Sequence, residues 1–173
     1  MSQDPRALLK QAEEKLSRGG GFWGFMSDKS DAYSTAVQLF TSAANAFEKQ
    51  GSYVEAGKAY ERAAEVHIQK LEDAVDGKMC LENAFDIYLK AVDPVAAGRC
   101  IKAMAESFRK INPESKDRQA HRLAKPYERM AAMYEVELQD MGAASEMYQA
   151  AADAMNPETS PLYACKTIAD QIS

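Results

Sequence analysis

The chain has 173 residues, of which 46% are hydrophobic and 27% charged, with a formal net charge of −5 and a pI near 5.2. This balance excludes a largely disordered chain, and the acidic pI argues against a general nucleic-acid binder. Prolines are scarce and helix-forming residues such as alanine, glutamate and lysine are plentiful, so the composition favours an all-α protein.

The N-terminal sequence MSQDPRALLKQAEEKL has no long apolar run, and no later segment has one either. We therefore expect neither a secretory signal nor a membrane-spanning helix, so that any membrane contact is peripheral. Cys80, Cys100 and Cys165 lie far apart, each within a helical pattern. This spacing predicts reduced, buried thiols in a cytoplasmic protein.

Apolar residues recur every three to four positions along most of the chain, which predicts helices throughout. Pro126 falls inside one of these helices and is expected to kink or split it. Loops are predicted over Asn112–Lys116 and Asn156–Ser160. The expected helices are Asp4–Ser17, Asp31–Lys49, Tyr53–Leu71, Glu72–Lys90, Pro94–Ile111, Asp117–Gln139, Gly142–Met155 and Pro161–Ile172.

Three of these helices begin with a similar phrase: SYVEAGKAY from Ser52, DPVAAGRCI from Asp93 and DMGAASEMY from Asp140. Small residues let two helix backbones approach closely, and a bulky residue one turn later fills the next groove. This step recurs at Ala43/Phe47, Ala56/Tyr60, Ala84/Tyr88 and Ala144/Tyr148. We therefore predict one helical-repeat domain over residues 1–173, a tetratricopeptide-like α-solenoid in which antiparallel helix pairs form a twisted sheet of helices. A plain helical bundle is the alternative.

Residues suited to catalysis or to metal binding do not cluster in the sequence. His67 and His121 lack ligand-spaced partners, and we expect His67 to be packed or half-buried and His121 to face water or a partner. No phosphate-binding or nucleophile-elbow motif is present. We therefore expect no enzyme activity, cofactor or metal. Five methionines could form a plastic peptide groove, but their spacing favours core positions: Met130, Met133, Met141, Met147 and Met155.

Basic residues are concentrated between Arg99 and Arg129, with nine Lys/Arg against four Asp/Glu, a local balance of +5. The rest of the chain has a balance of −10. A basic stretch on an acidic protein indicates a docking face for an acidic partner, although a solvated helix face is the alternative.

The segment GGGFWGFM, within a loop predicted over residues 18–28, places four bulky side chains among glycines: Phe22, Trp23, Phe25 and Met26. Exposed aromatic residues risk aggregation unless they bind something. These side chains are suited to insert into a bilayer interface, where they would give only weak, reversible attachment. Alternatively, they fold back over the first helix pair.

The stretches LLKQAEEKL, GFWGFM, AANAFEKQGSYVEAGKAYERAAEVH, MAAMYEVELQD and YQAAADAM, in this order, resemble the alpha-SNAP family of soluble NSF attachment proteins. The resemblance implies an adaptor that has no catalytic site and is a monomer in solution. It also implies that several copies bind along an assembled, syntaxin-type SNARE bundle. It implies recruitment of the ATPase NSF, which separates that bundle in vesicle transport, including transport between the endoplasmic reticulum and the Golgi. It further implies that the aromatic loop contacts the membrane and that basic residues contact the acidic SNARE surface.

Carried over residue by residue, the resemblance places Phe22, Trp23, Phe25 and Met26 on the membrane loop. Lys125 falls on a basic family position. Arg118 lies one residue from a second such position, with Arg122 one turn on, and Lys166 falls on a third. A further family lysine would fall on Asp170, which has the opposite charge.

Family members continue through further helices to an acidic C-terminus that engages the ATPase, whereas this sequence stops at Ser173. The resemblance therefore implies an N-terminal portion or a shortened relative that keeps the SNARE and membrane contacts without productive ATPase coupling. A generic tetratricopeptide-like peptide receptor is the alternative function. That receptor would bind a short peptide without depending on Phe22 or Trp23.

Overall fold

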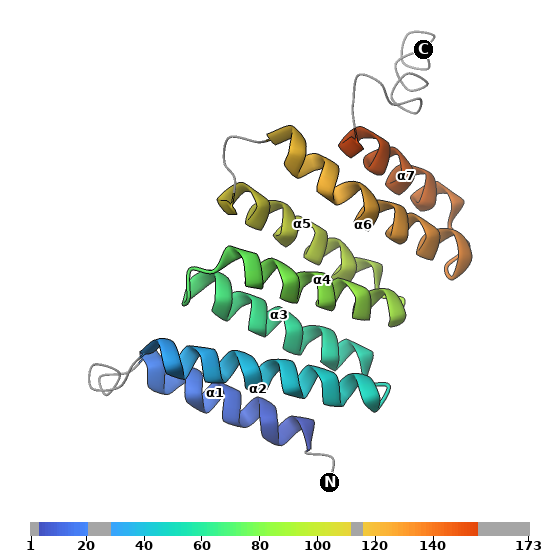
Figure 1. Cartoon of the computed structure of the whole chain (residues 1–173). Coiled ribbons are helices and arrows are strands. Elements are labelled where there is room, and N and C mark those ends of the chain that lie inside the picture. The colour runs from blue at the N-terminus through green and yellow to red at the C-terminus, as the bar shows by residue number, and fades with distance from the viewer. Residues whose placement is uncertain (1–3, 21–28, 112–115, 156–173) are drawn as a thin grey trace, which may run out of the picture. The chain divides into compact units, whose positions relative to one another are not determined.

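The computed structural model describes residues 4–20, 29–111 and 116–155, and helices are the regular structure within these ranges (Figure 1). The predicted all-α class is confirmed. The helices are α1 Pro5–Gly20, α2 Lys29–Lys49, α3 Tyr53–Gln69, α4 Ala74–Lys90, α5 Pro94–Ile111, α6 Lys116–Val136 and α7 Met141–Met155. They match the first seven predicted helices within a few residues at each end. The eighth, Pro161–Ile172, lies outside the described residues.

Four of the turns between helices have the same backbone conformation. In each, a residue with positive φ, between 52° and 74°, stands two residues before the first residue of the next helix, with a Ser or Asp between them: Gly51, Glu72, Val92 and Gln139. Asp93 then accepts a hydrogen bond from the N–H of Ala96 at 2.9 Å, and Asp140 accepts one from the N–H of Ala143 at 3.0 Å. These bonds satisfy donors that have no partner within a helix. The repeated phrase therefore marks a repeated turn, which the copies at Asp93 and Asp140 combine with a side-chain cap.

The chain divides into two compact units, Met1–Ser107 and Phe108–Ser173, with the boundary inside α5. In the first unit α1 packs against α2, α2 against α3 and α3 against α4. Side chains also join helices that are two apart in the sequence. Arg62 of α3 forms an ion pair with Glu13 of α1 at 2.9 Å, and Lys90 of α4 forms one with Glu48 of α2 at 2.6 Å. Contacts to both the next helix and the next but one are typical of stacked helix pairs.

The core of the first unit is built from small and bulky residues in alternation. Phe40 is fully buried among alanines of α1, α2 and α3, and Val37 and Val66 complete the cluster. The alanines bring the backbones close, and the larger side chains fill the space between helices. Three of the four Ala-to-aromatic steps predicted from the sequence are therefore packing units, with Phe47, Tyr60 and Tyr88 buried, whereas Tyr148 of the fourth is exposed.

In the second unit α6 packs against α7. The helix α6 continues through Pro126 from Lys116 to Val136, so the expected split does not occur. The methionine prediction is correct in part, because Met130 and Met133 are buried. Met141 and Met155 are instead more than half exposed. None of the described helices has the length and apolar character that a bilayer span requires.

Candidate functional site

Two of the predicted binding residues lie together on α6. Arg122 and Lys125 are both exposed, and their spacing of three residues puts them on the same side of the helix. Arg129 follows one turn after Lys125 on that side. The side chains of Leu123 and Ala124 are buried, as are those of Met130 and Ala131. The helix α6 is therefore amphipathic: its basic side is exposed, and its apolar side is buried.

Arg122 is positioned by an aromatic ring. Its guanidinium lies over the Phe108 ring, 5.4 Å from the ring centroid, within the second unit. Such a cation–π contact restrains the long side chain without neutralising its charge. No ion pair joins Arg122 or Lys125 to a carboxylate in the part of the chain that the structure describes. Among the described residues, both side chains are therefore exposed and have no carboxylate partner.

Basic residues of the first unit are placed differently. Arg62 donates to both carboxylate oxygens of Glu13 and also pairs with Glu65, and its guanidinium lies 5.5 Å from the Phe40 ring centroid. Arg99, the first residue of the basic stretch, lies 3.4 Å from a carboxylate oxygen of Glu61. The basic stretch is thus not uniform, because its first member is engaged within the fold.

Glu61 of the first unit contacts side chains of two other helices, and sequence reasoning did not identify it. Its Oε2 accepts a hydrogen bond of 2.6 Å from the Tyr88 hydroxyl, and the Arg99 guanidinium lies beside the same oxygen. The Sγ of Cys100 lies 4.0 Å from Oε1. Burial, reinforced by the Glu61 charge, raises the pKa of Cys100 to about 12 and also raises the pKa of Tyr88. Tyr88 and Cys100 therefore stay protonated and unreactive. Together with Arg99 they link Glu61 of α3 to α4 and α5, so we assign Glu61 a structural role.

Burial also raises the pKa of Cys80, to about 11. Both described cysteines are free thiols. Cys100 is buried as predicted, whereas Cys80 is only partly buried, and Cys165 lies outside the described residues. A thiol with a raised pKa is a poor nucleophile and a poor metal ligand at neutral pH. Neither cysteine is therefore a candidate for catalysis.

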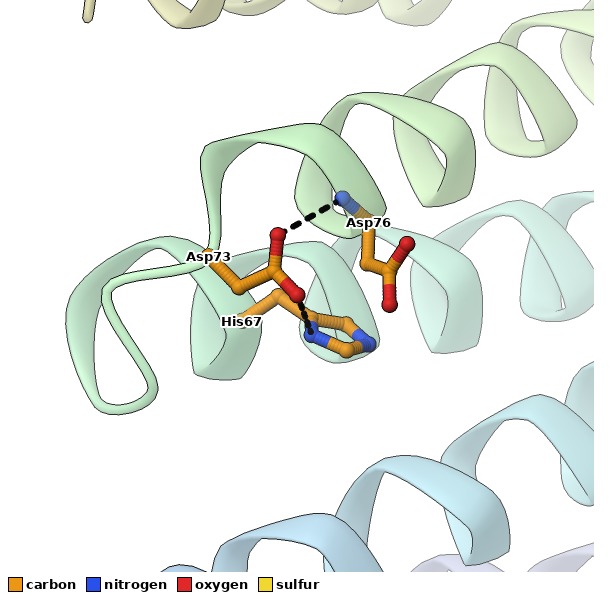
Figure 2. A group of neighbouring side chains, drawn as sticks. All are labelled: His67, Asp73 and Asp76. Carbon is orange, nitrogen blue, oxygen red and sulfur yellow. Dashed lines mark hydrogen bonds and ion pairs between the residues drawn. The ribbon is translucent and has the colours of Figure 1, made fainter. Parts of the chain in front are cut away.

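His67, Asp73 and Asp76 come together at the turn between α3 and α4 (Figure 2). Asp73 caps α4, because its Oδ1 accepts hydrogen bonds from the N–H groups of Val75 and Asp76 at 3.1 and 3.0 Å. Its Oδ2 lies 3.9 Å from Nδ1 of the mostly buried His67. Each of the three side chains could offer one atom to a cation, all within 4.8 Å of one another. Since one Asp73 oxygen already serves the cap, we assign this group to the turn.

The described residues leave part of the predicted site untested. Phe22, Trp23, Phe25 and Met26 lie outside them, and so does Lys166. The backbone of Arg118 lies in α6, one turn before Arg122, but its side chain is also outside the described set. His121 is exposed on α6, as expected. The aromatic segment is bracketed by the end of α1 at Gly20 and the start of α2 at Lys29.

Residues 3–170 match the family model described as "Soluble NSF attachment protein, SNAP". The chain is 35% identical over 159 residues to a probable vesicular-fusion protein sec17 homolog of Neurospora crassa, and 33% identical over 156 residues to one of Schizosaccharomyces pombe. It is 29% identical over 154 residues to the human alpha-soluble NSF attachment protein.

These alignments cover 88%, 88% and 89% of this chain and 50% of each relative, so the chain spans about half the length of the curated relatives it matches. A family match over nearly the whole chain agrees with the stacked helix pairs of the structure. The chain therefore belongs to the soluble NSF attachment protein family.

Proposed function

We propose that this chain is an adaptor in vesicle trafficking that binds assembled SNARE bundles and recruits an NSF-type ATPase to them, without chemistry of its own. Family membership supports this role, as do relatives named as vesicular-fusion and NSF attachment proteins. The observation that carries the proposal is the exposed basic side of α6, at Arg122 and Lys125.

The contact is electrostatic. A SNARE bundle is acidic, and Arg122 and Lys125 carry charges that no described carboxylate of the chain neutralises. Complementary charge speeds association and sets orientation more than it adds affinity. Several copies along one bundle then hold the complex by avidity. We include Arg118 and Lys166 in the proposed contact, on the resemblance alone.

A pull-down with an assembled SNARE bundle at low and at raised salt tests this proposal. We expect clear binding at low ionic strength that weakens several-fold at 0.5 M salt, on the order of the screening expected for exposed charges. Adding an NSF-type ATPase to the same beads tests recruitment, and we expect the ATPase to be retained only when this chain is present. Absent or salt-independent SNARE binding contradicts the charged contact.

We also propose that Phe22, Trp23, Phe25 and Met26 form a membrane-contact segment. In the sequence the segment stands between α1, which ends at Gly20, and α2, which begins at Lys29, and these two helices pack against each other. Burying a Phe or Trp side chain contributes about 1.5–3 kcal/mol, so one copy is expected to attach weakly and reversibly.

Co-flotation with liposomes tests the membrane contact. We expect wild-type protein to float in part and the Phe22→Ser/Trp23→Ser variant to remain at the bottom of the gradient. The Val54→Ser variant is a matched control, because Val54 is an exposed apolar residue of α3 outside the segment. Equal flotation of all three proteins would favour a generic peptide receptor that does not depend on the aromatic segment.

A further inference from the structure

The turn between α3 and α4 has ligand atoms that its own structure does not use. The cap of α4 takes only Oδ1 of Asp73, which leaves Oδ2 of the same carboxylate facing Nδ1 of His67 at 3.9 Å. Asp76, in the first turn of α4, adds a second carboxylate. Each of the three residues has an atom within 4.8 Å of the other two, and Figure 2 shows both carboxylates beside the imidazole ring.

His67 has a buried nitrogen without a partner. The side chain is only 14% exposed, and its Nδ1 is enclosed and has no hydrogen-bond partner among the described residues. The separation of 3.9 Å from Asp73 is too long for a hydrogen bond. A polar atom that is removed from water without a partner costs free energy, and in folded proteins it commonly indicates a bound water or ion. This nitrogen therefore points to a ligand independently of the two carboxylates.

The backbone holds His67 and Asp73 in this arrangement. The N–H of Asp73 donates a hydrogen bond of 2.9 Å to the carbonyl of His67. The two helices touch directly beside these residues, because a Cβ on Gly77 would lie 2.4 Å from the side chain of Ile68. The cap bonds also fix the Asp73 carboxylate, in the way that outer hydrogen bonds orient ligating carboxylates in metal sites. Two of the three residues are thus positioned before any ion binds.

We propose that His67, Asp73 and Asp76 also bind a divalent transition-metal cation such as Zn²⁺, which joins the end of α3 to the start of α4. Zinc accepts imidazole nitrogen together with carboxylate oxygen, whereas magnesium and calcium prefer oxygen alone. The cation gives the buried Nδ1 a partner. It also offsets the repulsion between two carboxylates that lie close together.

The distances fit an ion of this kind. Two ligand atoms of a tetrahedral zinc ion lie about 3.3 Å apart, so the gap between Nδ1 of His67 and Oδ2 of Asp73 has to close by only about half an ångström. Asp76 is exposed, so its side chain is free to complete the set, and water takes the fourth position. No metal was expected from the sequence, because the three residues lie on both sides of a turn rather than at ligand spacing along one helix.

Nuclear magnetic resonance of the imidazole nitrogens tests the proposal on the full chain, with Zn²⁺ as the only addition. The chain has two histidines, and His121, which is exposed on α6, is an internal control. We expect Zn²⁺ to shift the Nδ1 resonance of His67 along a saturating curve and to leave the His121 resonances unchanged. An unchanged Nδ1 resonance of His67 at excess zinc overturns the proposal. Equal shifts of both histidines also overturn it, because they indicate non-specific binding.

Calorimetric titration with Zn²⁺ gives a second measurement. Asp76→Asn removes one ligand without touching the cap bonds, and Glu72→Gln is the matched control, since it removes the same charge from an exposed residue of the same turn. Both variants and their reference chain carry Cys80→Ala and Cys165→Ala, so that these thiols do not compete for zinc. We expect Asp76→Asn to weaken binding by at least about tenfold. Glu72→Gln should weaken it by less than about twofold.

Equal affinities of the two variants contradict the proposal, because general acidity of the turn would then account for the binding. Circular dichroism checks that each variant keeps its helices. Neither measurement involves SNARE or membrane binding, so the cation site can hold or fail independently of the proposed function.

Discussion

At the scale of single residues, Gly57 sets the distance between α3 and α4. A Cβ at this position would lie 2.5 Å from two ring atoms of Tyr88, whose hydroxyl is held by Glu61. The ring cannot swing away without losing that hydrogen bond. The absence of a side chain at residue 57 therefore permits the close packing of these two helices.

We expect Gly57→Ala to lower the free energy of unfolding by about 1–3 kcal/mol, because overpacking forces the ring or the backbone to shift. Gly142→Ala is the matched control, since its Cβ would have only an ordinary 3.4 Å contact with Asp140. The control should be neutral or slightly stabilising, as alanine is the better helix former. Urea denaturation followed by circular dichroism measures both, and equal effects would refute the packing argument.

Cys100 makes stability depend on pH in the alkaline range. Burial and the Glu61 charge raise the pKa of its thiol from an ordinary value near 9 to about 12 in the folded chain. The folded state therefore holds its proton where the unfolded state has lost it, and stability falls as the pH rises through this interval. We expect this group to contribute a loss of about 1.4 kcal/mol for each pH unit above 9.

Urea midpoints of wild type and Cys100→Ala at pH 8, 9.5 and 10.5 test this dependence. The variant should lose less stability than wild type as the pH rises, whatever its stability at pH 8. Parallel curves for the two proteins would show that Cys100 does not titrate as described.

At the scale of helices, the caps differ in a way that makes a direct comparison possible. Asp73 accepts two backbone hydrogen bonds at the start of α4, whereas the Ser52 side chain makes no cap bond at the start of α3. We expect Asp73→Ala to lower the free energy of unfolding by about 1 kcal/mol. Ser52→Ala should lower it by only about 0.3 kcal/mol, because no cap bond is lost. Thermal unfolding of the two variants measures the difference. Equal losses would mean that the cap bonds of Asp73 are not stabilising.

The helices could be predicted from the sequence because apolar periodicity and cap residues are local signals. The turn conformations could not, since only Gly51 among the four positive-φ residues is a glycine, and Val92 is a residue type that disfavours this region. The exposure of Met141 and Met155 was also missed, because spacing identifies an apolar face but not whether another helix covers it.

The candidate site shows the same limit at the scale of the whole molecule. The charge count predicted a basic stretch, but it could not separate Arg99, which pairs with Glu61, from Arg122, which lies over an aromatic ring. Ion pairing depends on residues that are distant in the sequence, and these are known only once the helices are packed. The sequence did place Arg122 and Lys125 together correctly, because their spacing on one helix is local.

The importance of where the basic charges lie can be tested with two variants that make the same change in net charge at different places. We expect Arg122→Glu/Lys125→Glu to weaken binding to an assembled SNARE bundle by about tenfold or more at low salt, since two exposed attractive contacts become repulsive. The Lys10→Glu/Lys15→Glu variant is the matched control. It makes the same change in net charge at exposed positions of α1 and should weaken binding much less.

The salt dependence identifies the cause of any loss. Raising the ionic strength to 0.5 M shortens the screening length to about 4 Å, so the difference between the two variants should shrink there to less than about threefold. Surface plasmon resonance at several salt concentrations gives both rates, and the loss should appear mainly in the association rate, because rim charges steer encounter more than they hold the complex. If both variants lose binding equally at every salt concentration, net charge alone governs the interaction. The basic side of α6 is then not the contact surface.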